Sequence, residues 1–314
     1  MRAPERGYSG PRDTLRRVSA SAFRQALARA SLRPETGVAV DFKQPAGEPA
    51  LAPHDGVAWQ VFRNPVSLFV GGVTAVILEL AEPRVRSGIW DHTSFRTDPL
   101  TRMERTGLAA MVTVYGAHSV AEKMIAGVSR MHARVSGTTP DGVAYRADDP
   151  ELLDWVHATA NFGFLEAYCA FVRPLSRAER DHFYAEGTAA AQLYGAVGAP
   201  ASVAELERLF AAMRPKLEPS PIVFEFLEIL HRTPIFPGPL RPIQSMLIRA
   251  AVEITPAWVR EILGLDARYG SRRLEPTLIR GLGRLGNQIV PPSSPPADAC
   301  RRLGIPVENL RSQM

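Results

Sequence analysis

This chain has few cysteines and no long apolar segment, and both shortages exclude classes of protein. Its two cysteines, Cys169 and Cys300, cannot form a disulfide framework, and neither lies in a Cys-x-x-Cys-His motif. Covalent c-type haem is therefore excluded, and so low a cysteine content is typical of a reducing compartment. The most apolar run, residues 66–81, is shorter than the roughly 20 residues of a membrane span and contains Glu79. We predict that it forms a buried helix in a protein without a transmembrane segment.

The sequence also lacks the modules of nucleic-acid recognition, although it is basic. Its 314 residues carry 37 basic and 32 acidic side chains, a net charge of +5, and much of the excess is arginine near the two ends. No zinc-finger spacing, basic zipper or RNA-binding signature accompanies these arginines, so we expect no nucleic-acid partner. No apolar core of a signal peptide follows Arg16 and Arg17, which predicts a cytoplasmic protein.

Helix signals, in contrast, are frequent between Ala58 and Leu265, and strand signals are rare. Only a short extended segment near Val143–Tyr145 is expected, after a Pro-Asp-Gly turn. Asp-Pro pairs and Ser-x-x-Glu capping boxes predict helix starts at 98–99, 149–150, 176–179 and 202–205. The fold class predicted from these signals is all-α.

We expect three parts along the chain. Residues 1–50 are polar and rich in Pro, Gly and Arg, and predict a basic extension. Residues 51–265 predict a single multi-helix domain that contains the functional site. Residues 266–314, with Pro-Pro-Ser-Ser-Pro-Pro at 291–296, predict an irregular C-terminal extension.

His132 is the most informative residue of the predicted domain. It shares one face of a predicted helix with Met124, Val128 and Val135, at i, i+4, i+8 and i+11. A buried imidazole without a partner costs about 1–3 kcal/mol, so the ring needs a hydrogen-bond acceptor or a metal. Burial favours the neutral ring, which is the form that binds metal. The alternative is a core histidine bonded to a backbone carbonyl.

His157 is a second histidine in an apolar helix stripe. The members of that stripe are Leu153, His157, Ala160 and Phe164. The ring could contact a cofactor beside His132, or it could form a buried polar bridge to Tyr145 or Asp148. The sequence leaves both alternatives open.

Arg102, Arg105 and Thr106 are spaced so that all three can face one side of a helix. Two cations and a hydroxyl aimed into a cleft could hold a haem propionate or a ligand derived from dioxygen. The alternative is a solvated helix start.

Two further patterns match known motifs without their structural context. The glycines at 281, 283 and 286 match a dinucleotide-binding fingerprint, but no strand signal precedes them. The Glu-x-x-His pairs at 179–182 and 228–231 match part of a di-iron site. However, Glu179 is expected to act in a capping box, and His231 lies at a predicted helix end. We therefore favour neither site.

Six segments, in this order, carry a resemblance to a known family. They are Leu-Ala-Glu-Pro (80–83), Gly-Ile-Trp-Asp-His-Thr-Ser-Phe (88–95), Arg-x-x-Arg-Thr (102–106), Arg-Met-His-Ala-Arg-Val-x-Gly (130–137), Tyr-Arg-Ala-Asp-Asp-Pro-x-Leu-Leu-x-Trp-Val-His-Ala-Thr (145–159) and Pro-Leu-Ser-x-Ala-Glu (174–179). The chain resembles the MpaB-like oxygenases, which share a catalytic domain with rubber oxygenase (latex clearing protein). The likeness runs from about Trp59 to Leu265.

The resemblance implies an all-α fold with globin-like character and a non-covalent haem b. It places the axial iron ligand at His132, and Arg102, Arg105 and Thr106 on the distal side. Arg105 stands where the rubber oxygenases carry a lysine that can cap the iron. Arginine stays protonated and cannot ligate, so we expect no such cap here.

The resemblance also suggests a catalytic base. Glu82 stands where many relatives carry histidine, and a carboxylate there is expected to act as a distal base. Glu79, one helical turn earlier, is the competing residue.

Together these inferences predict a haem b-dependent oxygenase or oxidase. Its partners would be O2 and a hydrophobic small molecule with an alkene or prenyl chain, and a homo-oligomer is compatible with the sequence. The predicted site comprises His132 as metal ligand, His157 and Arg102 at the haem, and Arg102, Arg105, Thr106 and Glu82 in catalysis. Two alternatives stay open: a haem-dependent dehydrogenase of a small secondary metabolite, and a haem- or ligand-binding protein without turnover.

Overall fold

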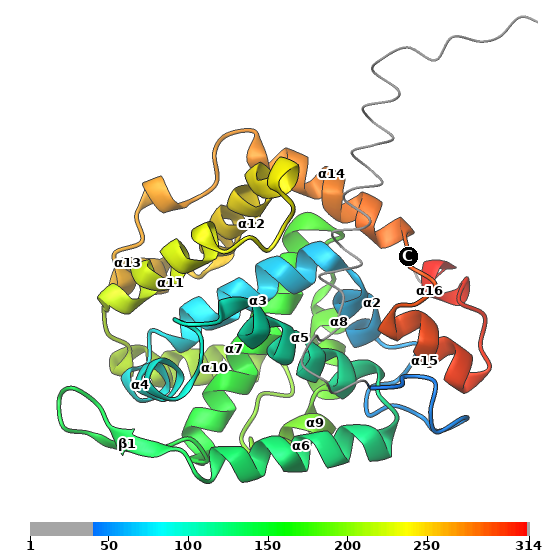
Figure 1. Cartoon of the computed structure of the whole chain (residues 1–314), viewed down its shortest axis with the longest axis horizontal. Coiled ribbons are helices and arrows are strands. Elements are labelled where there is room, and N and C mark those ends of the chain that lie inside the picture. The colour runs from blue at the N-terminus through cyan, green and yellow to red at the C-terminus, as the bar shows by residue number, and fades with distance from the viewer. Residues whose placement is uncertain (1–39, 313–314) are drawn as a thin grey trace, which may run out of the picture.

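Helices account for almost all of the regular structure in the computed structural model, which describes residues 40–312 (Figure 1). The predicted all-α fold is confirmed, whereas most of the basic extension, residues 1–39, lies outside the described residues. The α-helices are α2 (Val57–Arg63), α3 (Pro65–Glu79), α4 (Pro83–His92), α5 (Pro99–Tyr115), α6 (His118–His132), α7 (Pro150–Phe171), α8 (Arg177–Glu186), α9 (Thr188–Tyr194), α10 (Val203–Met213), α11 (Pro221–Arg232), α12 (Arg241–Ile254), α13 (Ala257–Leu263), α14 (Glu275–Gln288), α15 (Pro295–Leu303) and α16 (Asn309–Ser312). Short 3-10 turns are η1 (Arg214–Lys216), η2 (Gly238–Leu240) and η3 (Ala267–Tyr269).

The predicted helix starts are confirmed by their capping hydrogen bonds. Asp98 and Asp149 accept from backbone amides of the first turns of α5 and α7, and each is followed by proline at the first helical position. Ser176 and Glu179 form the expected capping box at α8. At α10 only half of the box forms, because Glu205 accepts from the amide of Ala201.

One antiparallel hairpin follows α6, formed by β1 (Ser136–Thr138) and β2 (Ala144–Arg146), with Gly137 opposite Tyr145. The extended segment expected near Val143–Tyr145 is therefore confirmed, shifted by one residue. Ala147 donates its backbone N–H to the carbonyl of Val135 at 2.9 Å. The hairpin and this bond thus fix the position of the residues that follow His132 at the end of α6.

The centre of the molecule is the crossing of α3 and α7, where two glycines let the helix backbones touch. The apolar run of residues 66–81 forms α3, as predicted, and most of its side chains are buried. A Cβ on Gly71 would lie 2.6 Å from the Cα of Phe164, and a Cβ on Gly163 would collide with the carbonyl oxygen of Gly71. Glycine costs about 1 kcal/mol in a helix interior, so its use here reflects the close approach of the helices.

We expect Gly163→Ala to lower the free energy of unfolding by about 2 kcal/mol, because a methyl group there must push two backbones apart. Urea unfolding measures the change. The matched control is Gly281→Ala, another helical glycine, around which a Cβ would find open space. That substitution should raise stability by a few tenths to about 1 kcal/mol. Equal effects of the two substitutions would contradict a tight crossing.

The C-terminal region differs from the expected irregular extension. Two helices, α14 and α15, lie between Glu275 and Leu303 and contribute side chains such as Ile279 and Ala299 to the core. Arg302 is 3% exposed and donates to the backbone carbonyls of Phe42 and Tyr115, so it joins α15 to the segment before α2 and to the end of α5. Local composition did not predict α14 and α15, because the contacts that stabilise these helices come from residues far apart in the sequence.

The glycines that resemble a dinucleotide fingerprint lie inside α14, away from any helix N-terminus. A Cβ at Gly283 would collide with the carbonyl oxygen of Phe171 in α7, and one at Gly286 would press on Pro65. These glycines therefore allow close helix packing.

Among the described residues, no single helix is long and apolar enough to cross a membrane. The helices α2 and α3 meet the length and composition of a span only when taken as a pair, and they are bent by 92° relative to each other.

Candidate functional site

Three ionisable side chains lie within electrostatic range of one another where α3 ends, α5 begins and α6 ends, with Arg102 acting on the other two. They are Glu79 in the last turn of α3, Arg102 in the first turns of α5, and His132 at the last residue of α6. Arg102 acts electrostatically on both of the others: it lowers the pKa of Glu79 and also that of His132. We call Glu79, Arg102 and His132 the Glu–Arg–His cluster.

The imidazole of His132 lacks a partner within the described residues. It is half-buried, and its Nδ1 is shielded from solvent yet forms no hydrogen bond. Desolvation lowers the pKa of the ring, the charge of Arg102 lowers it further, and Asp148 opposes both effects. The ring is therefore neutral at physiological pH, with a lone pair available for a ligand. The alternative prediction, a bond from this ring to a backbone carbonyl, finds no support in the structure.

Glu79 is the carboxylate of the cluster. Burial raises its pKa to about 7, and Arg102 counteracts part of that shift. No hydrogen bond from the described residues reaches its oxygens. A carboxyl group whose pKa lies near neutrality can take up and release a proton under physiological conditions.

Arg102 differs in burial from Arg105 and Thr106, the two residues predicted to accompany it. Its guanidinium is half-buried, and desolvation lowers its pKa without making it neutral. Arg105 and Thr106 are exposed, and the hydroxyl of Thr106 donates to the carbonyl of Arg102. The structure thus brings Arg102 into the cluster and leaves the other two side chains at the surface.

Glu82, the first-choice catalytic base, occupies a different environment. It is 1% exposed and caps α4: one oxygen accepts from the amide of Val85 and the other from the Nε of Arg84, both at 2.7 Å. Arg84 also forms an ion pair with Glu151, which in turn forms an ion pair with Lys216. Both oxygens of Glu82 are occupied by this structural network, whereas no hydrogen bond from the described residues reaches those of Glu79.

His157 contacts neither of the residues proposed for a polar bridge. Its Nε2 lies 2.9 Å from the Nδ2 of Asn161, one turn further along α7, and burial lowers the pKa of the ring to about 4. Tyr145 instead pairs with the Nε2 of His92 at 3.1 Å, and Asp148 pairs with Arg146. The expected bridge to Tyr145 or Asp148 is therefore wrong. A contact of His157 with a cofactor stays a prediction.

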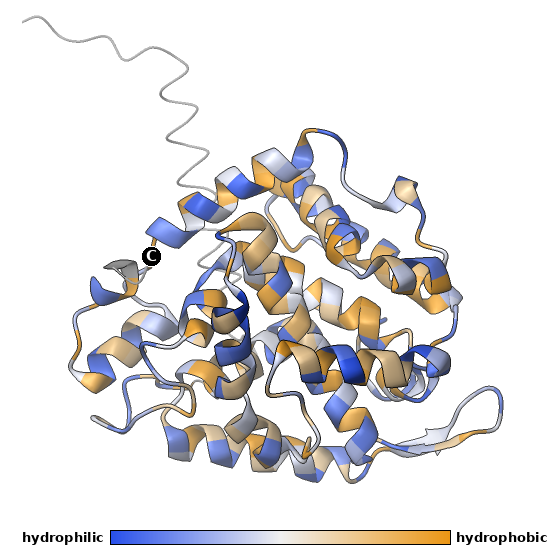
Figure 2. Cartoon of the chain, turned by 180° about the vertical axis from the view of Figure 1, so that it is seen from behind, coloured by the Kyte–Doolittle hydropathy of each residue, from blue (hydrophilic) through white to orange (hydrophobic). Residues whose placement is uncertain are grey.

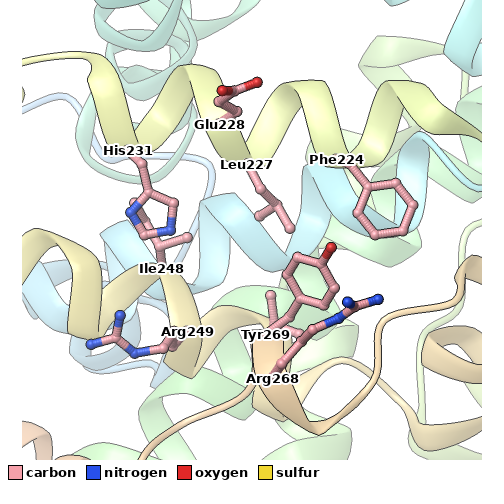
Figure 3. Close-up of a pocket in the computed structure, with 9 residues that line it drawn as sticks. Phe224, Leu227, Glu228, His231, Ile248, Arg249, Arg268 and Tyr269 are labelled. Carbon is pink, nitrogen blue, oxygen red and sulfur yellow. The ribbon is translucent and has the colours of Figure 1, made fainter.

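A pocket of about 390 Å3 lies elsewhere, between α11, α12 and η3 (Figure 3). Its apolar wall includes Leu227 and Tyr269, while His231 and Arg249 line its polar side. His231, one of the di-iron candidates, lies near Ser245, with 3.3 Å between Nδ1 and the hydroxyl. No residue of the Glu–Arg–His cluster lines this pocket, so its size alone does not identify the site of chemistry.

The fold and the cluster together define an all-α protein whose converging helices hold a partnerless neutral histidine beside an arginine and a titratable carboxylate. Residues 59–287 match the family described as ER-bound oxygenase mpaB/B'/Rubber oxygenase, catalytic domain, and the chain belongs to this family. It is accordingly an oxidoreductase that uses O2 and a small-molecule substrate with a redox cofactor. The matched region extends beyond the expected limit at Leu265 and includes nearly all of α14. Comparisons with curated proteins and with solved structures gave no match.

Proposed function

We propose that this protein is a haem b-dependent oxygenase acting on a hydrophobic small molecule that carries an alkene or a prenyl chain. The observation that carries the proposal is the half-buried imidazole of His132, which is neutral and whose shielded Nδ1 has no hydrogen-bond partner. A neutral imidazole is the commonest protein ligand of haem iron, and iron would satisfy the unused nitrogen. The donor chemistry of His132 therefore fits the role of ligand to this cofactor.

When bound, the haem iron supplies the activation of O2, and the protein determines axial ligation, polarity and access. His132 would hold the iron and Arg102 would neutralise a propionate or negative charge that develops nearby. Glu79 would accept a proton from the substrate, because burial brings its pKa to about 7. The charge of Arg102 lowers the pKa of Glu79 and so keeps a larger fraction of the carboxyl group ionised.

The direct test is the absorption spectrum of the purified protein, oxidised and reduced, followed by product analysis under labelled O2. A Soret band and incorporation of the label support the proposal. A haem protein whose products carry no label would be the dehydrogenase alternative, and one that consumes no O2 with any substrate would be a binding protein. A folded protein that stays colourless after haem is added would contradict the proposal.

Arg102→Gln should raise the pKa of both His132 and Glu79, because the positive charge lowers both values in the wild type. A pH titration of the imidazole and carboxyl signals by NMR on the haem-free protein measures the two shifts. Arg105→Gln is the matched control, since Arg105 lies on the same helix but is exposed. If both variants shifted His132 equally, Arg102 would have no special position in the cluster.

A further inference from the structure

The outer face of α14 carries apolar side chains that the core does not use. The inner face packs through residues that include Ile279, Gly283 and Gly286. Leu274, at the N-cap of this helix, and Leu278 and Leu285 point outward and are 72%, 56% and 40% exposed. They are three of the seven large hydrophobic side chains that are exposed among the described residues, and their spacing places them on one helical face. We call Leu274, Leu278 and Leu285 the leucine row.

Arginines accompany the leucine row, and no exposed acid of α14 neutralises them. Arg273 and Arg284 are exposed and make no side-chain hydrogen bond or ion pair with the described residues, while Arg280 donates only to the carbonyl of Ala170. The single acidic residue of α14, Glu275, is buried and bound by Arg249. The outer face is therefore both apolar and positively charged.

We propose that this face of α14 docks onto an anionic lipid bilayer. Leucines that insert into the interface beside arginines that attract anionic headgroups are the features of interfacial helices. The position of α14 suits this role, because it lies along the outer edge of the molecule in the view of Figure 1 and in the view from behind in Figure 2. Its inner face is held by the core, so binding needs no ordering of a free segment.

Charge favours a membrane over the two occupants that the chain itself could supply. A second copy docked through the same face would place Arg273, Arg280 and Arg284 against their own equivalents. Residues 1–39 contain eight arginines and three acidic side chains, so they would also be repelled. An anionic bilayer neutralises the arginines and covers the leucine row at once. This inference does not rest on the proposed haem chemistry.

The test is co-sedimentation of the full chain with vesicles of phosphatidylcholine alone or mixed with phosphatidylglycerol. We expect binding to the anionic vesicles only, weakened by salt. The double variant Leu278→Gln and Leu285→Gln should bind at least tenfold more weakly, and Arg273→Gln with Arg284→Gln should lose about fivefold per arginine. The matched control is Val197→Gln, a residue that is 74% exposed but lies outside α14.

Three outcomes would overturn the inference. Absence of binding to anionic vesicles would do so directly. Unchanged binding of the leucine and arginine variants would show that another part of the chain contacts lipid. Dimerisation of the wild type that the Leu278→Gln and Leu285→Gln variant abolishes would show that a second copy covers α14. Circular dichroism of each variant confirms that these exposed substitutions leave the fold intact.

Discussion

His132→Ala should abolish haem binding and, with it, turnover. The substitution removes the neutral imidazole whose partnerless nitrogen is proposed to hold the iron. Even the loss of residues that only orient a metal ligand weakens metal binding by 10–100-fold, so the loss of the ligand itself should cost at least about 100-fold. The measurement is haem content per chain, read from the Soret band after gel filtration.

Two further variants make this experiment decisive. His118→Ala is the matched control, because His118 is the first residue of the same helix α6 and its side chain is 48% exposed. It should retain full haem content. His132→Gly leaves space for free imidazole, which should restore the Soret band of that variant. Retention of the wild-type spectrum by His132→Ala would assign the iron to another ligand, and His157→Ala would then be the next variant to measure.

Glu79→Gln should lower turnover by about 10²–10⁴-fold with haem content unchanged, since it removes the proposed proton acceptor. In the wild type the carboxylate forms as the pH rises through about 7, so turnover should rise over that interval. The variant should lose this dependence. A pH profile of kcat for both proteins measures the difference.

The stability of the haem-free protein provides a second measurement on Glu79. Its pKa is raised in the folded state, so its contribution is fully favourable below pH 4.5 and is lost as the pH rises through about 7. Glu79→Gln should therefore raise stability at pH 8, by about 1–3 kcal/mol once the partial exposure of this side chain is allowed for. A residue that weakens the fold but is needed for turnover is typical of a functional site.

Glu82→Gln is the matched control for Glu79→Gln, because Glu82 is the competing carboxylate. Loss of its capping bonds should reduce the free energy of unfolding by about 1–2 kcal/mol, with kcat nearly unchanged. If instead Glu82→Gln abolished turnover and Glu79→Gln did not, the base would be Glu82, as the sequence alone favoured.

The sequence by itself determined the local structure of this protein. Helix starts at Asp98, Asp149 and Ser176 follow from capping chemistry that acts within one helical turn. The apolar stripe also placed His132 on the inner side of α6. These features depend on neighbours that are close in the chain, so a single sequence contains the information for them.

Only the tertiary structure decided which of these residues meet. Folding brings Glu79, Arg102 and His132 together from three helices. In the fold, Glu82 caps α4 and forms an ion pair with Arg84, and His157 pairs with Asn161 on its own helix. Folding also formed α14 and α15 from a region whose composition suggested irregular chain. Desolvation and the electrostatic field of Arg102 depend on residues distant in sequence, and packing brings those residues together only in the folded protein.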